Sequence, residues 1–168
     1  LQENGARIVD ANGNERMYKV HATDDPREVS GAKHALVLVK SWQTERAARQ
    51  LKESLAEDGL AITLQNGIGN KETLIRDLGT GRVSLGITTT GATLVGPGLV
   101  KMGGEGTISL EQNQALGPLE AALRSSNFNL QIVDDAKSLM WGKLVINAAI
   151  NPLTALLRIT NGELLSRP

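Results

Sequence analysis

Residues 134–162 have the sequence DDAKSLMWGKLVINAAINPLTALLRITNG, and the organisation of the chain follows from this stretch. Its first half predicts a helix, because apolar residues recur three and four positions apart. Lys143, Asn147 and Asn151 interrupt the apolar pattern at intervals of four residues, which places them in one slowly curling stripe on a single helix face. Pro152 cannot donate a backbone hydrogen bond, so we expect the helix to kink or break beside Asn151.

The stripe formed by Lys143, Asn147 and Asn151 has two interpretations. One ammonium and two amides that face inward can bind a small molecule carrying oxygens, such as a carboxylate, a hydroxyl or a carbonyl. The alternative is the ordinary solvated face of an amphipathic helix, although such a face usually carries more charge and is less closely surrounded by Leu, Val, Ile and Ala. The spacing alone leaves both interpretations open.

Upstream of this stretch, short apolar segments alternate with helical patterns. Residues 35–39 (ALVLV), 60–64 and 83–87 predict strands, the first of a kind that is buried on both faces. Residues 44–58 predict an amphipathic helix, and residues 72–78 predict a shorter one. Strand, helix, strand, helix, strand with short connections is the pattern of a parallel α/β sheet with right-handed crossovers.

The remaining segments predict additions to this sheet. Residues 7–9 and 17–21 predict two short strands around an Asn-Gly turn. Residues 99–110 contain a glycine-rich centre between two apolar runs and predict an antiparallel hairpin appended to the sheet. Residues 115–126 predict a helix, and residues 129–133 predict a last strand.

Composition limits the class of protein. The 168 residues hold 18 basic and 18 acidic side chains, so charge gives no indication of a nucleic-acid or membrane partner. No apolar run approaches the roughly 20 residues of a membrane span. Cysteine is absent and only two histidines are present, which excludes thiolate ligands and argues against a histidine-rich metal site. We expect a cytoplasmic protein with an aliphatic core, no metal, and no nucleic-acid or membrane partner.

Polar residues follow each of the three predicted parallel strands. Lys40 follows the first strand, Asn66 the second, and a run of threonines begins at Thr88 after the third. Ligands of open parallel sheets bind outside the carboxyl ends of the strands, so Lys40, Asn66 and residues 88–92 should share one edge and face the Lys143 stripe across a cleft. Taken singly, Lys40 fits a surface lysine and Asn66-Gly67 fits an ordinary turn.

Motifs of other chemistries are missing from the sequence. It contains no GxGxxG phosphate loop, which such a sheet edge often carries. No Ser/His/Asp set and no paired-carboxylate motif stands out. The residues themselves therefore predict a binding edge without its phosphate loop.

Five segments resemble the ketopantoate reductase (2-dehydropantoate 2-reductase) family: LVLVKSWQT, LQNGIGN, GITTTGA, GPGLVKMGGEGT and WGKLVINAAINPLTALLRITNGEL. The resemblance covers nearly the whole chain, and the last segment is the most specific. It implies an α/β fold class, with an incomplete Rossmann-type parallel sheet and an appended hairpin, followed by the first helix of an all-helical C-terminal domain. Residues 1–133 would be a partial Rossmann dinucleotide-binding domain without its first strand and GxGxxG loop, and residues 134–168 would begin the helical substrate and dimerisation domain.

The resemblance also implies a reaction. Members of the family reduce ketopantoate to pantoate with NADPH, on the route to pantothenate and coenzyme A. Lys143 matches the lysine that donates a proton to the substrate carbonyl. Asn147, Asn151 and Asn161 match amides that bind the substrate. This assignment agrees with the stripe of one ammonium and two amides described above.

The same resemblance assigns the cofactor NADP(H) to the sheet edge. Lys40 and Asn66 match positions that contact the nicotinamide cofactor near the cleft, and Ala92 matches a backbone contact to it. The small-molecule partner would be a 2-oxo acid.

Two alternatives remain beside ketopantoate reduction. A related reductase could use the same fold and hydride chemistry on another branched 2-oxo acid or on a 3-hydroxy acid. A truncated fragment without activity of its own would account for the missing glycine loop. The helix around Lys143 carries more apolar side chains than one face can bury, so we expect a homo-oligomer formed through the helical region.

Overall fold

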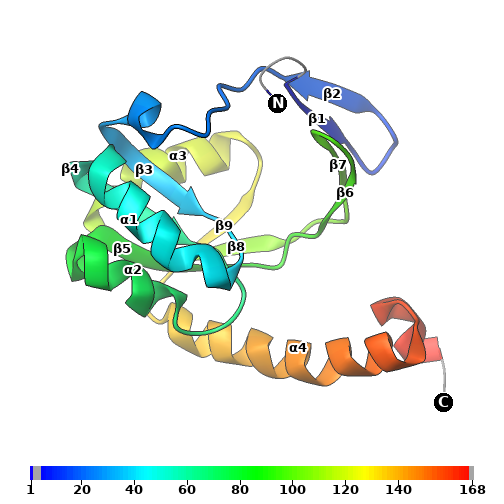
Figure 1. The fold of residues 1–168 in the computed structure, drawn as a ribbon. Coiled ribbons are helices and arrows are strands. Elements are labelled where there is room, and N and C mark those ends of the chain that lie inside the picture. The colour runs from blue at the N-terminus through cyan, green and yellow to red at the C-terminus, as the bar shows by residue number, and fades with distance from the viewer. Residues whose placement is uncertain (2–4, 167–168) are drawn as a thin grey trace.

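The computed structural model describes Leu1 and residues 5–166, and its main element is a five-stranded sheet (Figure 1). Its strands, in spatial order, are β3 (Ala32–Val37), β4 (Leu55–Thr63), β5 (Val83–Thr88), β8 (Thr107–Glu111) and β9 (Asn129–Val133). β3, β4 and β5 are parallel, β8 is antiparallel to β5, and β9 is parallel to β8. The α/β fold class is therefore confirmed, and the three strands that precede the predicted binding edge run in one direction.

Helices cover both faces of this sheet. α1 (Thr44–Ser54) and α2 (Asn70–Leu78) contribute to a buried cluster on one face that includes Val37, Ala61 and Val83. α3 (Gly117–Ser125) packs on the other face, where the buried cluster includes Leu60 and Ile62 of the same strand β4. Alternate residues of a strand point to opposite faces, so the unbroken apolar run in β4 supplies both clusters. Short 3₁₀ helices occur at η1 (Pro26–Val29), η2 (Ser41–Gln43), η3 (Thr80–Arg82), η4 (Gln114–Leu116) and η5 (Asn161–Ser166).

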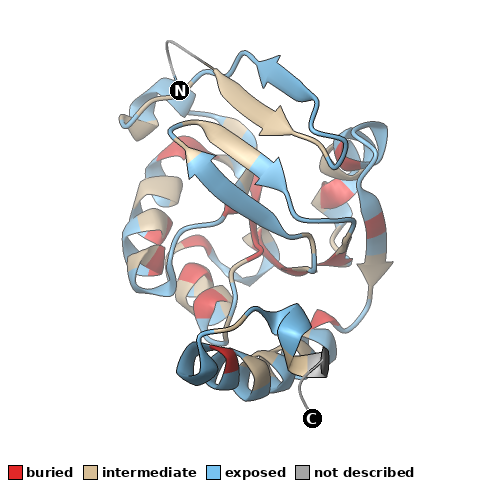
Figure 2. Ribbon diagram, turned by 90° about the vertical axis from the view of Figure 1, so that its right-hand side faces the viewer, coloured by how far each residue is buried: buried red, intermediate tan, exposed pale blue. Residues whose placement is uncertain are grey.

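A second, four-stranded sheet lies apart from the first (Figure 1). Its order is β2 (Glu15–Tyr18), β1 (Ala6–Val9), β7 (Leu99–Met102) and β6 (Ala92–Gly96). β1 and β2 form the antiparallel pair predicted around the Asn-Gly turn. None of the described residues in these four strands is buried, whereas buried residues are concentrated in the five-stranded sheet and its helices (Figure 2).

The predicted hairpin over residues 99–110 is wrong. β7 pairs with β6 and β1, whereas β8 pairs with β5 and β9 in the other sheet. The appended hairpin is instead formed by β6 and β7, and its turn contains Gly98 with a φ of +67°. The glycine-rich segment after β7 connects the two sheets, and a Cβ at Gly106 would collide with the backbone of Thr90. Glycine at that position serves a close backbone approach and not a hairpin turn.

Two further predictions from the sequence need correction. The helix predicted over residues 44–58 ends at Ser54, because Leu55 is buried in the sheet core and already begins β4. The strand predicted to be buried on both faces ends at Val37 as β3, and it leaves Leu36 exposed, as is Leu38 directly after it. In the described part of the chain β4 is the single neighbour of β3, which makes β3 an edge strand.

α4 (Ala136–Leu157) is the longest helix and extends away from the five-stranded sheet (Figure 1). Its N-cap is Asp135, whose side chain accepts hydrogen bonds from the backbone N–H groups of Lys137 and Ser138. Ala136 and Met140 contact the cluster around β5, so the first turns of α4 are anchored on the sheet. No helix within the described residues is long and apolar enough to cross a membrane.

Of the kink or break predicted beside Asn151, the break is wrong, because α4 continues through Pro152 to Leu157. Pro152 removes one donor, but its would-be acceptor belongs to the exposed Ala148, where water can bond to the carbonyl. The hydroxyl of Thr154 donates to the carbonyls of Ile150 and Asn151, each at 3.1 Å, and so adds hydrogen bonds around the proline turn. The helix ends at Arg158, which has a left-handed φ of +54°.

Candidate functional site

The carboxyl ends of β3 and β4 lie side by side and are joined by hydrogen bonds. Lys40 follows β3 at the start of η2, and Asn66 follows β4. The side-chain amide of Gln65 donates to the carbonyl of Val39 at 2.7 Å, and the hydroxyl of Ser41 donates to the carbonyl of Asn66 at 3.4 Å. The prediction that Lys40 and Asn66 share one sheet edge is confirmed.

The loop after β4 has a conformation that glycine favours. Gly67 and Gly69 have φ values of +87° and +88°, in the left-handed region. Asn70 then begins α2, and its side-chain amide donates to the carbonyl of Asn66 at 3.2 Å. The backbone of Asn66 is therefore fixed while its side chain remains exposed.

Lys143 on α4 lies against the end of β5. Its ammonium donates to the carbonyl of Thr88 at 2.6 Å. The side chain is half-buried, and this burial lowers the pKa of Lys143, because removal from water disfavours the charged form. Asn147 follows one helical turn further along α4 and is also half-buried.

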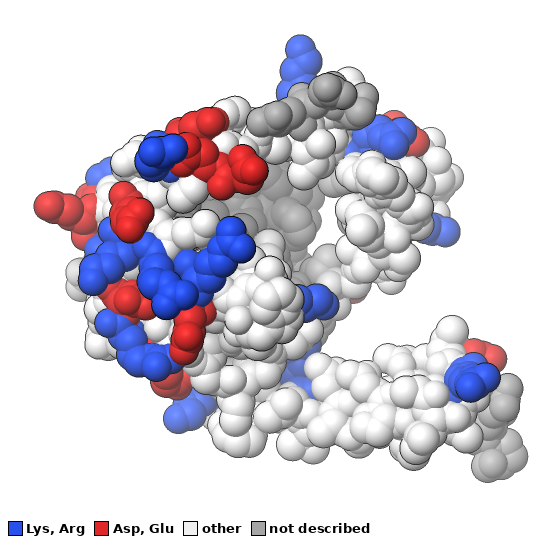
Figure 3. All heavy atoms as spheres, in the orientation of Figure 1, with Lys and Arg blue, Asp and Glu red and all other residues white. Residues whose placement is uncertain are grey.

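A small cleft between the ends of β4 and β5 and the helix α4 brings three of the predicted residues together. We call it the Lys143 cleft, and its lining consists of Gln65, Asn66, Gly67, Ile87, Met140, Lys143, Leu144 and Asn147. An ammonium and three amides thus share a site with three apolar side chains, which is the composition of a pocket for a small polar molecule. Figure 3 shows that the molecule is hollowed on this side, between the arm formed by α4 and the second sheet.

Four predicted residues lie outside the lining of the Lys143 cleft. Lys40 is exposed beside Asn66, Asn151 is exposed one turn beyond Asn147 on α4, and Asn161 is exposed in η5. Ala92 is exposed at the start of β6. The prediction that Ala92 shares the edge of the parallel sheet is wrong, because β6 belongs to the second sheet.

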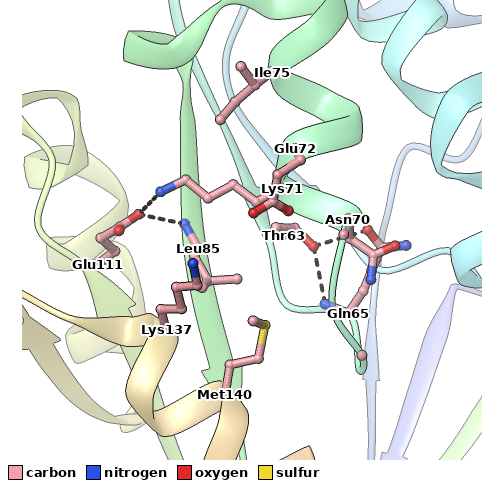
Figure 4. Close-up of a pocket in the computed structure, with 12 residues that line it drawn as sticks. Thr63, Gln65, Asn70, Lys71, Glu72, Ile75, Leu85, Glu111, Lys137 and Met140 are labelled. Atoms are coloured by element: carbon pink, nitrogen blue, oxygen red, sulfur yellow. Dashed lines mark hydrogen bonds and ion pairs between the residues drawn. The ribbon is translucent and has the colours of Figure 1, made fainter.

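A larger cavity of about 250 Å³ adjoins the Lys143 cleft and shares Gln65, Gly67 and Met140 with it. It lies between α2, β5 and the first turns of α4 (Figure 4). Lys71 forms an ion pair with Glu111 there, and Glu111 also accepts from the backbone N–H of Leu85 at 3.3 Å. The sequence predicted none of these contacts, because they join residues far apart in the chain.

Sequence reasoning also missed the supporting residues of the edge. Thr44 and Asn70 are both buried and are hydrogen-bonded to each other at 3.0 Å. Asn70 closes the segment QNGIGN, which was interpreted only as a polar loop. The sequence did contain a signal, because the loop carries two amides besides Asn66, those of Gln65 and Asn70. Whether these side chains face the interior depends on how α1 and α2 pack.

Comparison with known proteins shows the family of this chain. The family model described as ketopantoate reductase PanE/ApbA matches residues 1–115, and the model of its C-terminal part matches residues 135–168. The 2-dehydropantoate 2-reductase of Halobacterium salinarum is 33% identical and matches 100% of this chain and 57% of its own length. The corresponding protein of Archaeoglobus fulgidus is 36% identical, over 89% of this chain and 50% of its own length. The chain thus spans about half the length of these curated relatives.

Solved structures agree with these matches. A PanE/ApbA family ketopantoate reductase from Ralstonia eutropha JMP134 superimposes with a TM-score of 0.84 at 31% identity, covering 93% of this chain and 52% of that one. A 2-dehydropantoate 2-reductase from Geobacter metallireducens GS-15 also gives a TM-score of 0.84, at 28% identity over 94% of this chain and 54% of that one. Because the family models, the curated relatives and the fold agree, the chain belongs to the ketopantoate reductase PanE/ApbA family.

Proposed function

We propose that this chain forms the central part of an NADPH-dependent reductase that converts 2-dehydropantoate (ketopantoate) to pantoate. The observation that carries the proposal is the meeting of Lys143, Asn147 and Asn66 in one cleft at the carboxyl ends of parallel strands. Membership of the ketopantoate reductase family supports the choice of substrate. The activity is assigned to a complete reductase that contains this chain, because the relatives are about twice as long.

The residues at the sheet edge fit the nicotinamide end of the cofactor. Lys40 offers an exposed ammonium and Asn66 an exposed amide, which suit a phosphate and a carboxamide respectively. The family resemblance adds a backbone contact at Ala92. The chain has no GxGxxG motif, so we assign the binding of the pyrophosphate to residues outside it. When bound, the reduced nicotinamide supplies the hydride that is added to the substrate carbonyl carbon.

Lys143 supplies the proton in this proposal. Its ammonium already donates to a carbonyl oxygen, that of Thr88, and can donate to the 2-oxo group of a substrate in the cleft. The lowered pKa makes the proton easier to release, and the neutral amine left behind takes a proton from solvent. The carbonyl thus becomes a hydroxyl, with its hydrogen on carbon from the cofactor and its hydrogen on oxygen from Lys143.

The asparagines hold the substrate in the proposed arrangement. Asn147 lies inside the Lys143 cleft, where its amide can bind the substrate carboxylate or hydroxyl. Asn151 and Asn161 are exposed further along α4 and in η5, so we assign them to the outer end of the substrate. Correct placement of the reacting carbon against the nicotinamide depends on these amides.

The organisation of the chain follows from the same proposal. We place a domain boundary between residues 133 and 134. The C-terminal family model, which starts at residue 135, and the helix cap at Asp135 support this position. We also propose a cytoplasmic homo-oligomer that associates through the helical region. The exposed side chains of Trp141, Val145 and Ile146 on α4 support that surface as the interface.

The proposal is tested by turnover in a complete reductase that contains this chain. Ketopantoate-dependent loss of the absorbance of NADPH is the expected result, with NADH giving a slower reaction. A panel of other branched 2-oxo acids, and of 3-hydroxy acids with the oxidised cofactor, covers the alternative substrates. Faster turnover of a panel member would replace ketopantoate as the substrate, and no turnover of any of them would refute the reductase assignment. Residues 1–168 alone should show no turnover.

A further inference from the structure

A continuous series of hydrogen bonds lies beneath the sheet edge. The hydroxyl of Thr63 donates to the side-chain oxygen of Gln65 at 3.0 Å (Figure 4), and the amide of Gln65 donates to the hydroxyl of Thr44 at 2.9 Å. The hydroxyl of Thr44 donates to the side-chain oxygen of Asn70 at 3.0 Å, and the amide of Asn70 donates to the carbonyl of Asn66. We call Thr44, Thr63, Gln65 and Asn70 the Thr44 network.

Three of the four members of the Thr44 network are shielded from water, and Gln65 is half-buried. Thr63, Thr44 and Asn70 are 0%, 1% and 6% exposed. Buried hydroxyls and amides need partners, and here each donates in the same direction along the series, so that each bond strengthens the next. Breaking one of these bonds would leave a buried polar group without a partner, which costs free energy. The four side chains are therefore held in one arrangement.

The network ends on the carbonyl that precedes one predicted cofactor residue, Lys40, and on the carbonyl of the other, Asn66. The amide of Gln65 also donates to the carbonyl of Val39, which immediately precedes Lys40, at 2.7 Å. The other end of the network is the carbonyl of Asn66 itself. Thr44 belongs to α1 and Asn70 to α2, so helices and strand ends are fixed together at this point. Neither Thr44 nor Asn70 is part of the lining of the Lys143 cleft.

We infer that the Thr44 network is a positioning element that holds Lys40 and Asn66 at the spacing required by the nicotinamide end of the cofactor. The identity of that ligand rests on the proposed function, whereas the fixing of the two strand ends does not. Because Thr44 and Asn70 lie outside the lining of the Lys143 cleft, removal of their hydrogen bonds should weaken cofactor binding and leave proton donation intact.

The test uses Thr44→Val, which keeps the shape of the side chain and removes the hydroxyl, in a complete reductase that contains this chain. The dissociation constant and KM for NADPH should rise about tenfold, the usual effect of leaving a buried polar group unpaired, while kcat at saturating NADPH stays within about twofold. Thr44→Ser restores the hydroxyl and should restore binding. Asn70→Ala, which removes both the acceptor of the Thr44 hydroxyl and the link to Asn66, is the second variant and should give the same change.

Ser84→Ala is the matched control for the loss of a buried hydroxyl. Ser84 is buried on β5 and donates to the carbonyl of Glu111 at 2.9 Å, without a link to Val39 or Asn66. Ser84→Ala should lower thermal stability, as Thr44→Val should, and should leave the dissociation constant of NADPH unchanged. If Thr44→Val and Asn70→Ala bind NADPH as tightly as Ser84→Ala does, the positioning role is refuted.

A measurement without ligand separates this inference from the proposed function. Amide hydrogen exchange in peptides covering residues 38–43 and 64–70 should be faster in Thr44→Val than in Ser84→Ala. Unchanged exchange would overturn the inference even if the reductase turns over. Faster exchange in a protein that binds neither NADPH nor NADH would uphold the fixing of the strand ends and refute the proposed function instead.

Discussion

Lys143 occupies a position that is both anchored and chemically usable. It lines the cleft together with Leu144 and Met140, and its ammonium donates to the carbonyl of Thr88. This carbonyl is a neutral acceptor and binds the ammonium more weakly than a carboxylate would, so the ammonium can donate its hydrogen bond, and then its proton, to a substrate oxygen instead. The position therefore fits a proton donor better than a structural ion pair.

Replacement of Lys143, the proposed proton donor, should lower the rate of turnover and leave substrate binding unchanged. In a complete reductase, Lys143→Ala should lower kcat by about 10² to 10⁴, the usual contribution of a positioned general acid. Lys137→Ala is the matched control, because Lys137 is exposed on the first turn of the same helix and outside the Lys143 cleft. A kcat within about threefold of the unsubstituted enzyme, with chemistry limiting the rate, would contradict the assignment.

The lowered pKa of Lys143 predicts the alkaline pH range in which kcat falls. The protonated form is the donor, so kcat should fall as the pH rises through the pKa of the folded protein. Burial places this decline below the ordinary pKa of a lysine. Lys143→Arg keeps its proton far above that range and should show no such decline in the kcat profile. An identical alkaline limb in both enzymes would assign the titration to another group.

At the residue scale, the predictable part of the site is the part encoded by short spacing. Intervals of four residues on one helix placed Lys143 and Asn147 together, and both line the cleft. The same spacing predicted that Asn151 would join them, but α4 leaves the sheet before that turn and Asn151 is exposed outside the cleft. Thr44 and Asn70 were not predictable, since their roles arise from hydrogen bonds between helices distant in sequence.

At the scale of elements, the positions of the strands were predicted more reliably than the pairing between strands. Residues 129–133 form β9 as expected, and the apolar runs at 60–64 and 83–87 lie largely within β4 and β5. The apolar character of residues 99–110 correctly indicated two strands, yet each pairs in a different sheet. A glycine-rich link permits a hairpin or a connection, and only the packing of Gly106 against Thr90 distinguishes them.

The cap of α4 controls the element that carries Lys143. Asp135→Ala should lower the free energy of unfolding, because it removes the acceptor for the first backbone N–H groups of the helix. Hydrogen bonds from Ser138, first from its hydroxyl and then from its backbone, hold the pKa of Asp135 below its usual range. The stabilisation is therefore present above the ordinary carboxyl pKa and is lost as pH falls through the lower pKa of the folded state.

Denaturant titrations at neutral and at acidic pH check this prediction. The difference in unfolding free energy between the unsubstituted protein and Asp135→Ala should be largest at neutral pH and should shrink on acidification. Asp134→Ala is the matched control, because it removes the neighbouring carboxylate and leaves the cap in place. A difference that does not change with pH would show that the charge of Asp135 plays no part.

On the scale of the whole molecule, the site is built where independent units meet. The parallel sheet supplies Lys40 and Asn66, and α4 supplies Lys143 and Asn147. The second sheet and the outer half of α4 bound the hollow in front of them (Figure 3). Local sequence patterns indicated each unit, but not the separation of the two sheets, because that depends on pairing between β1 and β7, about ninety residues apart.

The surface of α4 predicts the behaviour of residues 1–168 in isolation. Val145 is 66% exposed and Leu156 is 81% exposed, and Ile146, Leu153 and Leu157 are also more than half exposed. Each large apolar side chain left in water forgoes roughly 1.5 to 3 kcal/mol of burial, so together they rival the net stability of a domain. We expect the isolated chain to associate through this helix, and light scattering should give a mass above that of the 17.9 kDa monomer. Val145→Lys combined with Ile146→Lys should shift the mass towards the monomer.

The isolated chain should also bind the cofactor weakly. Lys40 and Asn66 are in place at the sheet edge, but the sequence has no glycine loop leading into a helix N-terminus for the pyrophosphate. Much of the binding energy of a dinucleotide comes from that charged group, so calorimetry on residues 1–168 should show NADPH affinity far weaker than micromolar. A complete reductase containing the same residues is the control and should bind NADPH tightly. A stable monomer of residues 1–168 that binds NADPH at micromolar concentration would contradict both expectations, because it would show that this chain alone completes the site.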